Sequence, residues 1–142
     1  MLKLKVEIII NRPRERVWDF FTTSRNWKRW WGADLKKVEP GWEEGAIITW
    51  GNDTTSSIIE LIPQEMIRIG NNLISNIWQF KVFDKEKTLV EWEVISPIAR
   101  FSDGGVAYRI ELEATLKKLK QCIEELPLKK VSVKKKWWQF WK

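Results

Sequence analysis

The stretch LKLKVEIIINRPRERVWDFFTTSRNWKRWWG, residues 2–32, decides the fold because it passes from a strand pattern to two helix patterns. In residues 2–10 apolar and charged residues alternate over most of the segment, which predicts a strand with one buried face. Pro13 then stands where the first turn of a helix tolerates proline. The apolar residues that follow it lie at helical spacing and predict a helix over 14–21.

The second helix pattern raises the question of whether its tryptophans bind a ligand or only fill a core. Trp27, Trp30 and Trp31 stand at positions i, i+3 and i+4 and therefore share one helix face, while Lys28 and Arg29 point elsewhere. Tryptophan combines a large apolar area with one N–H donor, so it suits both a buried wall and a wet interface. From the stretch alone, both interpretations stay open.

The middle of the chain is typical of an antiparallel sheet. Glycine, proline and asparagine residues separate short apolar segments, which we expect to be strands at 34–39, 46–51, 56–62, 65–71, 75–84 and 87–95. Alternation is clearest in IWQFKVF, residues 77–83, and in TLVEWEV, residues 88–94. One face of the sheet is therefore predicted to be apolar and the other to face water.

The strongest helix pattern covers residues 105–126 and is closed by Pro127. A strand, two short helices, a run of strands and a long final helix predict an α+β fold. In such a fold one curved sheet wraps around the last helix and hides both apolar faces. The length suits one such domain, which we place at 1–127, followed by a basic, tryptophan-rich tail at 128–142.

Composition excludes several kinds of site. The chain has no histidine and one cysteine, Cys122, so neither a metal site nor an internal disulfide is expected, and no cofactor is predicted. With a single cysteine, a reducing cytoplasm is the expected location. No apolar run approaches the ~20 residues that a membrane-spanning helix needs.

These patterns together resemble the SRPBCC or START-like superfamily, and within it the homologues of the activator of the heat-shock-protein-ninety ATPase. The resemblance covers residues 2–126 and rests on VEIIINRPRERVWDFFTTSRNWKRWW, PGWEEGAIITW, IIELIPQEMIRI, TLVEWEV and GGVAYRIELEATLKKLKQCIEEL. It implies a helix-grip fold with a mostly apolar cavity between the curved sheet and the last helix. Members bind lipids, hormones or polyketides, some are cyclases or hydrolases, and others are partners of a chaperone. The resemblance transfers no catalytic residue.

Because fold does not fix function, the expected function is the simplest one: non-catalytic binding of a small apolar or aromatic ligand in that cavity. Strand alternation and the resemblance give the candidate ligand-binding residues, which are Trp27, Trp30, Trp31, Trp50, Ile58, Glu60, Trp78, Phe80, Trp92, Tyr108 and Leu112. In particular, Trp78 and Trp92 are expected to line the pocket. Bulky tryptophans can also fill such a space, and that alternative stays open.

Three candidate residues carry an alternative of their own. Strict alternation sets Glu60 on the inner face, where burial raises a carboxyl pKa unless a cation pairs with it, whereas a local bulge would turn it to solvent. Tyr108 either offers its hydroxyl to a ligand or is a core tyrosine. Cys122 is expected to be a small buried apolar residue, because no histidine is available to activate its thiol.

Two other functions remain as alternatives. A chaperone-associated protein-interaction module follows from the resemblance, and a homodimer is compatible with it. An enzyme of the cyclase or hydrolase kind needs an acid and a base that converge in the cavity. Only Glu60, Tyr108 and the arginines are candidates for those roles, so this alternative is less favoured.

The tail KKVSVKKKWWQFWK, residues 129–142, holds six lysines and no acid, so it carries the whole net charge of +6. Lysines beside aromatic rings suit an anionic membrane surface, where the protein would attach peripherally. The same residues suit docking on protein, including a second copy, and nucleic acid is the least favoured partner. The residues predicted to interact are Lys134, Lys135, Lys136, Trp137, Trp138, Phe140 and Trp141.

Overall fold

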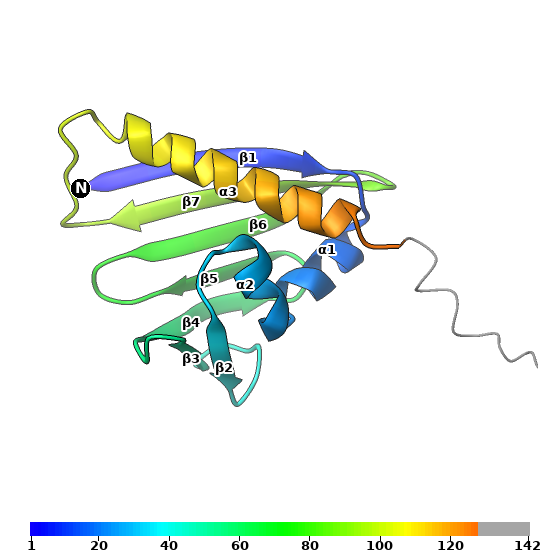
Figure 1. The fold of residues 1–142 in the computed structure, drawn as a ribbon, viewed down its shortest axis with the longest axis horizontal. Helices are drawn as coiled ribbons and strands as arrows, with labels where there is room; N and C mark the ends of the chain where they lie inside the picture. Colours follow the sequence, from blue (N-terminus) through cyan, green and yellow to red (C-terminus); the bar gives the residue numbers. More distant parts are fainter. Residues whose placement is uncertain (128–142) are drawn as a thin grey trace, which may run out of the picture.

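The computed structural model describes residues 1–127 and shows an α+β fold, in which one sheet is covered on one face by helices (Figure 1). In chain order the elements are β1 (Leu2–Ile10), α1 (Arg14–Phe21), η1 (Ser24–Asn26), α2 (Trp27–Trp30), β2 (Leu35–Glu39), β3 (Ile47–Trp50), β4 (Thr55–Ile62), β5 (Met66–Gly70), β6 (Ser75–Asp84), β7 (Lys87–Ser96) and α3 (Val106–Glu124). This order and the α+β class confirm the prediction from the sequence.

The sheet has seven antiparallel strands in the order β1-β7-β6-β5-β4-β3-β2. Strands β2 to β7 follow one another through hairpins, whereas β1 pairs with β7 from Leu2 opposite Ser96 to Ile10 opposite Thr88. The two strands that are consecutive at the start of the chain, β1 and β2, therefore form opposite edges of the sheet. Helices α1 and α2 carry the chain across the inner face between these edges (Figure 1).

Helix α3 crosses the inner face above β1 and β7 (Figure 1). Its buried stripe, Leu112, Leu116, Leu119, Cys122 and Ile123, recurs every three or four residues as an amphipathic helix requires. The helix begins after Gly105, whose φ is 90°. A Cβ there would also lie 3.3 Å from the Leu4 side chain of β1, so both the conformation and the close approach favour glycine.

The outer face of the sheet carries charged side chains, as the alternation predicts. The ammonium of Lys5 lies 3.5 Å from the Glu91 carboxylate, and that of Lys81 lies 2.9 Å from it. The hydrogen bond from Lys81 and the charge of Lys5 lower the pKa of Glu91, against the opposing effect of partial burial. Such half-exposed pairs contribute little stability, so the fold rests on its inner face.

No helix within residues 1–127 is long and apolar enough to cross a membrane. The tail residues from which we predict membrane or protein contacts lie outside the described residues, so those interactions stay predictions.

Candidate functional site

Tryptophan and phenylalanine side chains fill the space between the sheet and the helices. Trp78 of β6 and Trp92 of β7 face each other with ring centroids 5.4 Å apart and planes at 21°, and they are only 1% and 2% exposed. Phe21 and Trp27 pack against Trp78 at 5.1 and 5.8 Å. Trp78 and Trp92, which we expect to line the pocket, are therefore packed beneath rings from α1 and α2, and neither lines the cleft described below.

The remaining core candidates behave in the same way. They are fully or almost fully buried in the hydrophobic core, and none of them lines the cleft described below: Trp27, Trp30, Ile58, Phe80 and Leu112. Each buried tryptophan removes on the order of 200 Å² from water, which is worth about 5 kcal/mol at ~25 cal/mol per Å². For these residues the structure favours the core interpretation.

Glu60 lies on the outer face of β4 and is exposed. A β-bulge between Ile58 and Glu60 inserts one extra residue, so that Glu60 pairs with the outward-facing Arg68 and Leu61 turns toward the core. Of the two alternatives for Glu60, the structure shows the bulge, so this candidate ligand-binding residue takes no part in a site on the inner face.

An open cleft of about 710 Å³ lies at one end of the inner face. It is bounded by the residues that follow α2, by β3 and its turn into β4, by the start of β6 and by the first turns of α3. Its lining residues are Trp31, Ala33, Asp34, Trp50, Gly51, Asn52, Thr54, Ser56, Ile74, Asn76 and Tyr108. Of the residues predicted from the sequence, the cleft brings together Trp31, Trp50 and Tyr108.

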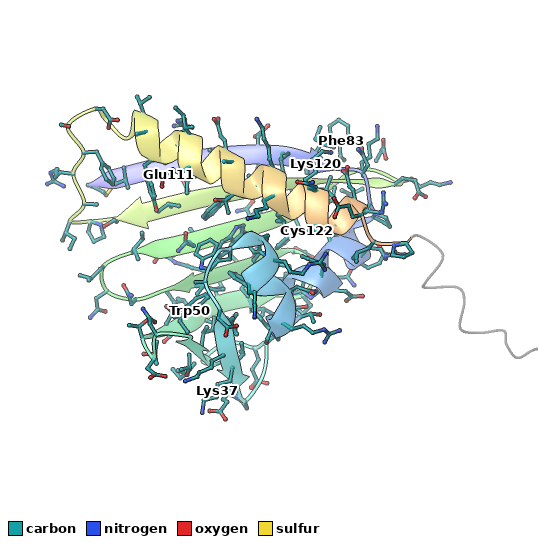
Figure 2. The ribbon with its side chains drawn as sticks, viewed as in Figure 1. Lys37, Trp50, Phe83, Glu111, Lys120 and Cys122 are labelled. Carbon is teal, nitrogen blue, oxygen red and sulfur yellow. The ribbon has the colours of Figure 1, made fainter. Side chains whose placement is uncertain are left out.

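Two indole rings form the aromatic wall of the cleft. Trp31 and Trp50 lie nearly parallel, with centroids 6.2 Å apart and planes at 25°, and both are only partly buried. Trp78 and Trp92 pack against Trp31, with ring centroids at 5.8 and 5.6 Å from its own. Trp50, labelled in Figure 2, donates its indole N–H to the Ser56 hydroxyl at 3.0 Å. The wall is therefore fixed by packing on one side and by a hydrogen bond on the other.

Polar groups line the rest of the cleft. Asn76 on β6 accepts the Trp92 indole N–H at 3.0 Å through its side-chain oxygen, which leaves its amide group as a donor. Asp34 follows α2 and is the one charged residue that the described part of the chain contributes to the lining. The sequence contains a signal for Asn76, because it shares the inner face with Trp78 and Phe80 by alternation. It contains none for Asp34, which lies between two regular elements.

Tyr108 borders the cleft from α3 and is partly buried. Burial, and then the negative charge of Glu111 one turn later, raise the pKa of its phenol. Its ring lies 5.4 Å from that of Phe101, which precedes the helix. The hydroxyl therefore stays protonated at neutral pH and can both donate and accept a hydrogen bond.

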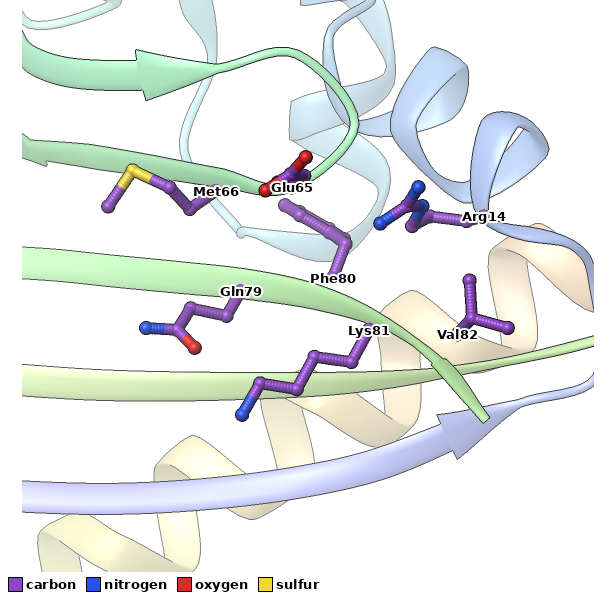
Figure 3. A pocket seen from close by; sticks show the side chains of 7 residues that line it. All are labelled: Arg14, Glu65, Met66, Gln79, Phe80, Lys81 and Val82. Carbon is purple, nitrogen blue, oxygen red and sulfur yellow. The ribbon is translucent and has the colours of Figure 1, made fainter. Parts of the chain in front are cut away.

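A second depression of about 430 Å³ lies where α1 begins beside β5 and β6 (Figure 3). Figure 3 shows Arg14 and Glu65 at its rim, with Phe80 between them and the outer-face residues Gln79 and Lys81 nearby. Phe80, a buried ring of the predicted set, thus borders this depression. The rim is mixed in charge and lacks a second aromatic wall, so it is the weaker candidate.

Metal ligands are not clustered in the described part of the chain, where no group of three or more histidine, cysteine or acidic side chains is placed to hold an ion. Cys122 is a buried free thiol between α3 and α2, and its sulfur lies 3.7 Å from the Arg29 carbonyl oxygen (Figure 2). Its surroundings fit the small buried apolar residue that we expect.

Similar architectures occur among solved structures. Protein SSP2350 from Staphylococcus saprophyticus is 17% identical, with a TM-score of 0.72 over 87% of this chain and 92% of that one. The Aha1 dimer from Colwellia psychrerythraea is 18% identical, with a TM-score of 0.67 over 88% and 98%. This chain has the helix-grip fold of Aha1-like proteins. CalU16 from Micromonospora echinospora, at 16% identity and a TM-score of 0.66 over 87% and 76%, shares it.

The Aha1-like architecture confirms the resemblance deduced from the five sequence segments, at the level of the fold. No protein-family model and no curated protein matches the sequence. At these identities the similarity shows the fold alone, so the function has to be inferred from the cleft itself.

Proposed function

We propose that this protein is a non-catalytic binding protein that holds a small apolar or aromatic molecule in the cleft bounded by Trp31, Trp50 and Tyr108. The observation that carries this proposal is the aromatic wall, in which two partly buried indoles border an open volume of about 710 Å³. Ligand sites combine apolar walls with a few fixed polar groups, and here Ser56 and Asn76 are such groups. This cleft lies at one end of the inner face rather than deep between the sheet and α3, because tryptophans occupy the deeper space.

Binding is favoured over catalysis by the chemistry of the lining. Acid–base catalysis needs a group whose pKa is tuned toward neutrality. The phenol of Tyr108 is shifted the other way, which makes it a weaker acid than a free tyrosine. Glu60, the other residue considered for such a role, lies on the outer face.

Three further partner proposals have less support. The Aha1 protein from Colwellia psychrerythraea was solved as a dimer, and this is the support for proposing a homodimer of the present chain. A chaperone-associated role rests on the sequence resemblance alone. Peripheral attachment to an anionic membrane rests on the sequence of the tail alone.

The binding proposal is tested by filling the cleft. Ala33 is an exposed lining residue, so Ala33→Trp adds bulk inside the cleft without disturbing the core. Ala114, exposed on α3 and absent from the cleft lining, provides the matched control Ala114→Trp. Binding of the neutral dye N-phenyl-1-naphthylamine should weaken about tenfold or more in Ala33→Trp and stay unchanged in the control. Equal binding by the two variants at equal melting temperature would refute the proposal.

A further inference from the structure

We propose that the ligand of this cleft is an organic cation, such as an alkylated ammonium or a protonated aromatic amine. This inference rests on the proposed binding function and adds to it the charge of the ligand. The charge of the cleft differs from that of the chain as a whole, which carries a net charge of +6. Among residues 1–127, the lining of the cleft nevertheless contains Asp34 and no lysine or arginine.

The carboxylate of Asp34 is not neutralised by a bonded cation within residues 1–127. Lys36 is the basic residue two positions later, and it donates its ammonium to Asp53 at 2.7 Å instead. The hydrogen bond to Asp53 is accordingly the main cause of the raised pKa of Lys36, and Asp34 is the smallest contribution. The Asp34 side chain is therefore not engaged by a cation of residues 1–127 at the edge of the cleft.

The aromatic wall also favours a cationic ligand. The faces of indole and phenol rings carry partial negative charge, and Trp31, Trp50 and Tyr108 border one volume. Glu111 adds a second negative charge beside Tyr108, where its field raises the phenol pKa. Alkylated ammonium groups bind to such rings because their methyl groups are weakly hydrated while their charge is attracted to the ring faces.

Anionic ligands are disfavoured by the same features. A carboxylate or phosphate in this cleft would face Asp34 with no lysine or arginine of the lining to pair with it. The Asn76 amide can hydrogen-bond a neutral acceptor but cannot balance a full charge. The lining thus distinguishes cationic from anionic ligands of the same shape.

The test uses the full chain and three probes of similar shape that differ in charge: benzyltrimethylammonium, the neutral neopentylbenzene and the anionic phenylmethanesulfonate. Affinities are measured by ligand-observed nuclear magnetic resonance at low salt. The cation should bind at least about tenfold more tightly than the neutral probe, and the anion more weakly than both. Asp34→Asn should remove most of the preference for the cation while leaving the affinity for the neutral probe unchanged.

Asp84→Asn is the matched control, because Asp84 ends β6 and is not a lining residue of the cleft. It removes the same charge and should leave the preference unchanged. If the unaltered protein binds the neutral probe as tightly as the cation, the cation inference fails while the binding function stands. If it binds none of the three probes, the binding function fails as well. An equal effect of both substitutions would assign the preference to net charge and overturn the role of Asp34.

Discussion

Trp27 donates its indole N–H to the carbonyl oxygen of Phe21 at 2.7 Å, inside the aromatic core. The ring centroid of Trp78 lies 5.8 Å from that of Trp27, and its N–H is equally buried but has no hydrogen-bond partner within residues 1–127. The two tryptophans are therefore alike in burial and differ in whether their polar atom is satisfied. This difference separates the contribution of packing from that of a buried hydrogen bond.

Replacing each of these two tryptophans by phenylalanine should give unequal losses of stability. Both substitutions remove similar apolar volume, but Trp27→Phe also leaves the buried Phe21 carbonyl without its partner. We expect Trp27→Phe to lower the free energy of unfolding by about 1–2 kcal/mol more than Trp78→Phe does. Urea unfolding at equal m-values measures the difference, and equal losses would contradict a stabilising role for this hydrogen bond.

Gly70 ends β5 where the chain turns into β6, and it has no room for a side chain. A Cβ there would clash with the Ile74 carbonyl oxygen and lie 2.8 Å from the Ser75 Cα, both of which are backbone atoms. Gly70→Ala should therefore cost about 2 kcal/mol or more, since the hairpin has to shift. Gly41→Ala is the control, because no atom lies within 4 Å of its Cβ, and it should stay within about 0.5 kcal/mol.

Glu124 links the end of α3 to the segment after β1, and its ionisation should make stability depend on pH. Burial alone would raise the pKa of this carboxyl, but the hydrogen bonds from the Asn11 N–H and from Lys120 outweigh it, so the pKa is lowered. A lowered folded-state pKa means that the stabilisation is present above the ordinary value of 4.5 and is lost as the pH falls through the folded-state value.

Glu124→Gln should therefore cost about 1 kcal/mol at pH 7 and progressively less as the pH falls below 4.5. Urea midpoints of the two proteins between pH 7 and pH 3 measure this convergence. Glu113→Gln, an exposed change on the same helix, should leave the curve of the unaltered protein unchanged. A constant difference between the curves of Glu124→Gln and the unaltered protein at all pH values would show that the ionised carboxylate is not the stabilising form.

The strands and α3 are predictable from the sequence because the apolar residues within each element repeat at the spacing of a strand or a helix. Residues 88–94 alternate and lie in β7, and the stripe through Leu112 and Leu119 lies in α3. The inner-face position of Trp78 is predictable for the same reason. Whether it lines a pocket or fills it depends on Phe21 and other rings that arrive from different elements, so no local pattern contains that information.

Two details of the site needed the structure. Strict alternation and a bulge are both compatible with the sequence around Glu60, and the register shift between Ile58 and Glu60 decides for the bulge. Asp34 reaches the cleft because the chain turns after α2, at Gly32 with a φ of 92°. Short irregular segments of this kind are positioned by the elements around them rather than by their own periodicity.

The pairing of β1 with β7 sets the order in which this protein can fold during synthesis. Leu2 pairs with Ser96, and the helix that covers β1 is α3, so β1, which precedes the other strands of this sheet in the chain, is among the last to be completed. Its apolar face, formed by Leu2, Leu4 and Val6, has neither its neighbouring strand nor its covering helix until most of the chain has emerged. Co-translational folding can therefore build the hairpins from β2 to β7 first, and closure of the sheet by β1 waits for long-range contacts.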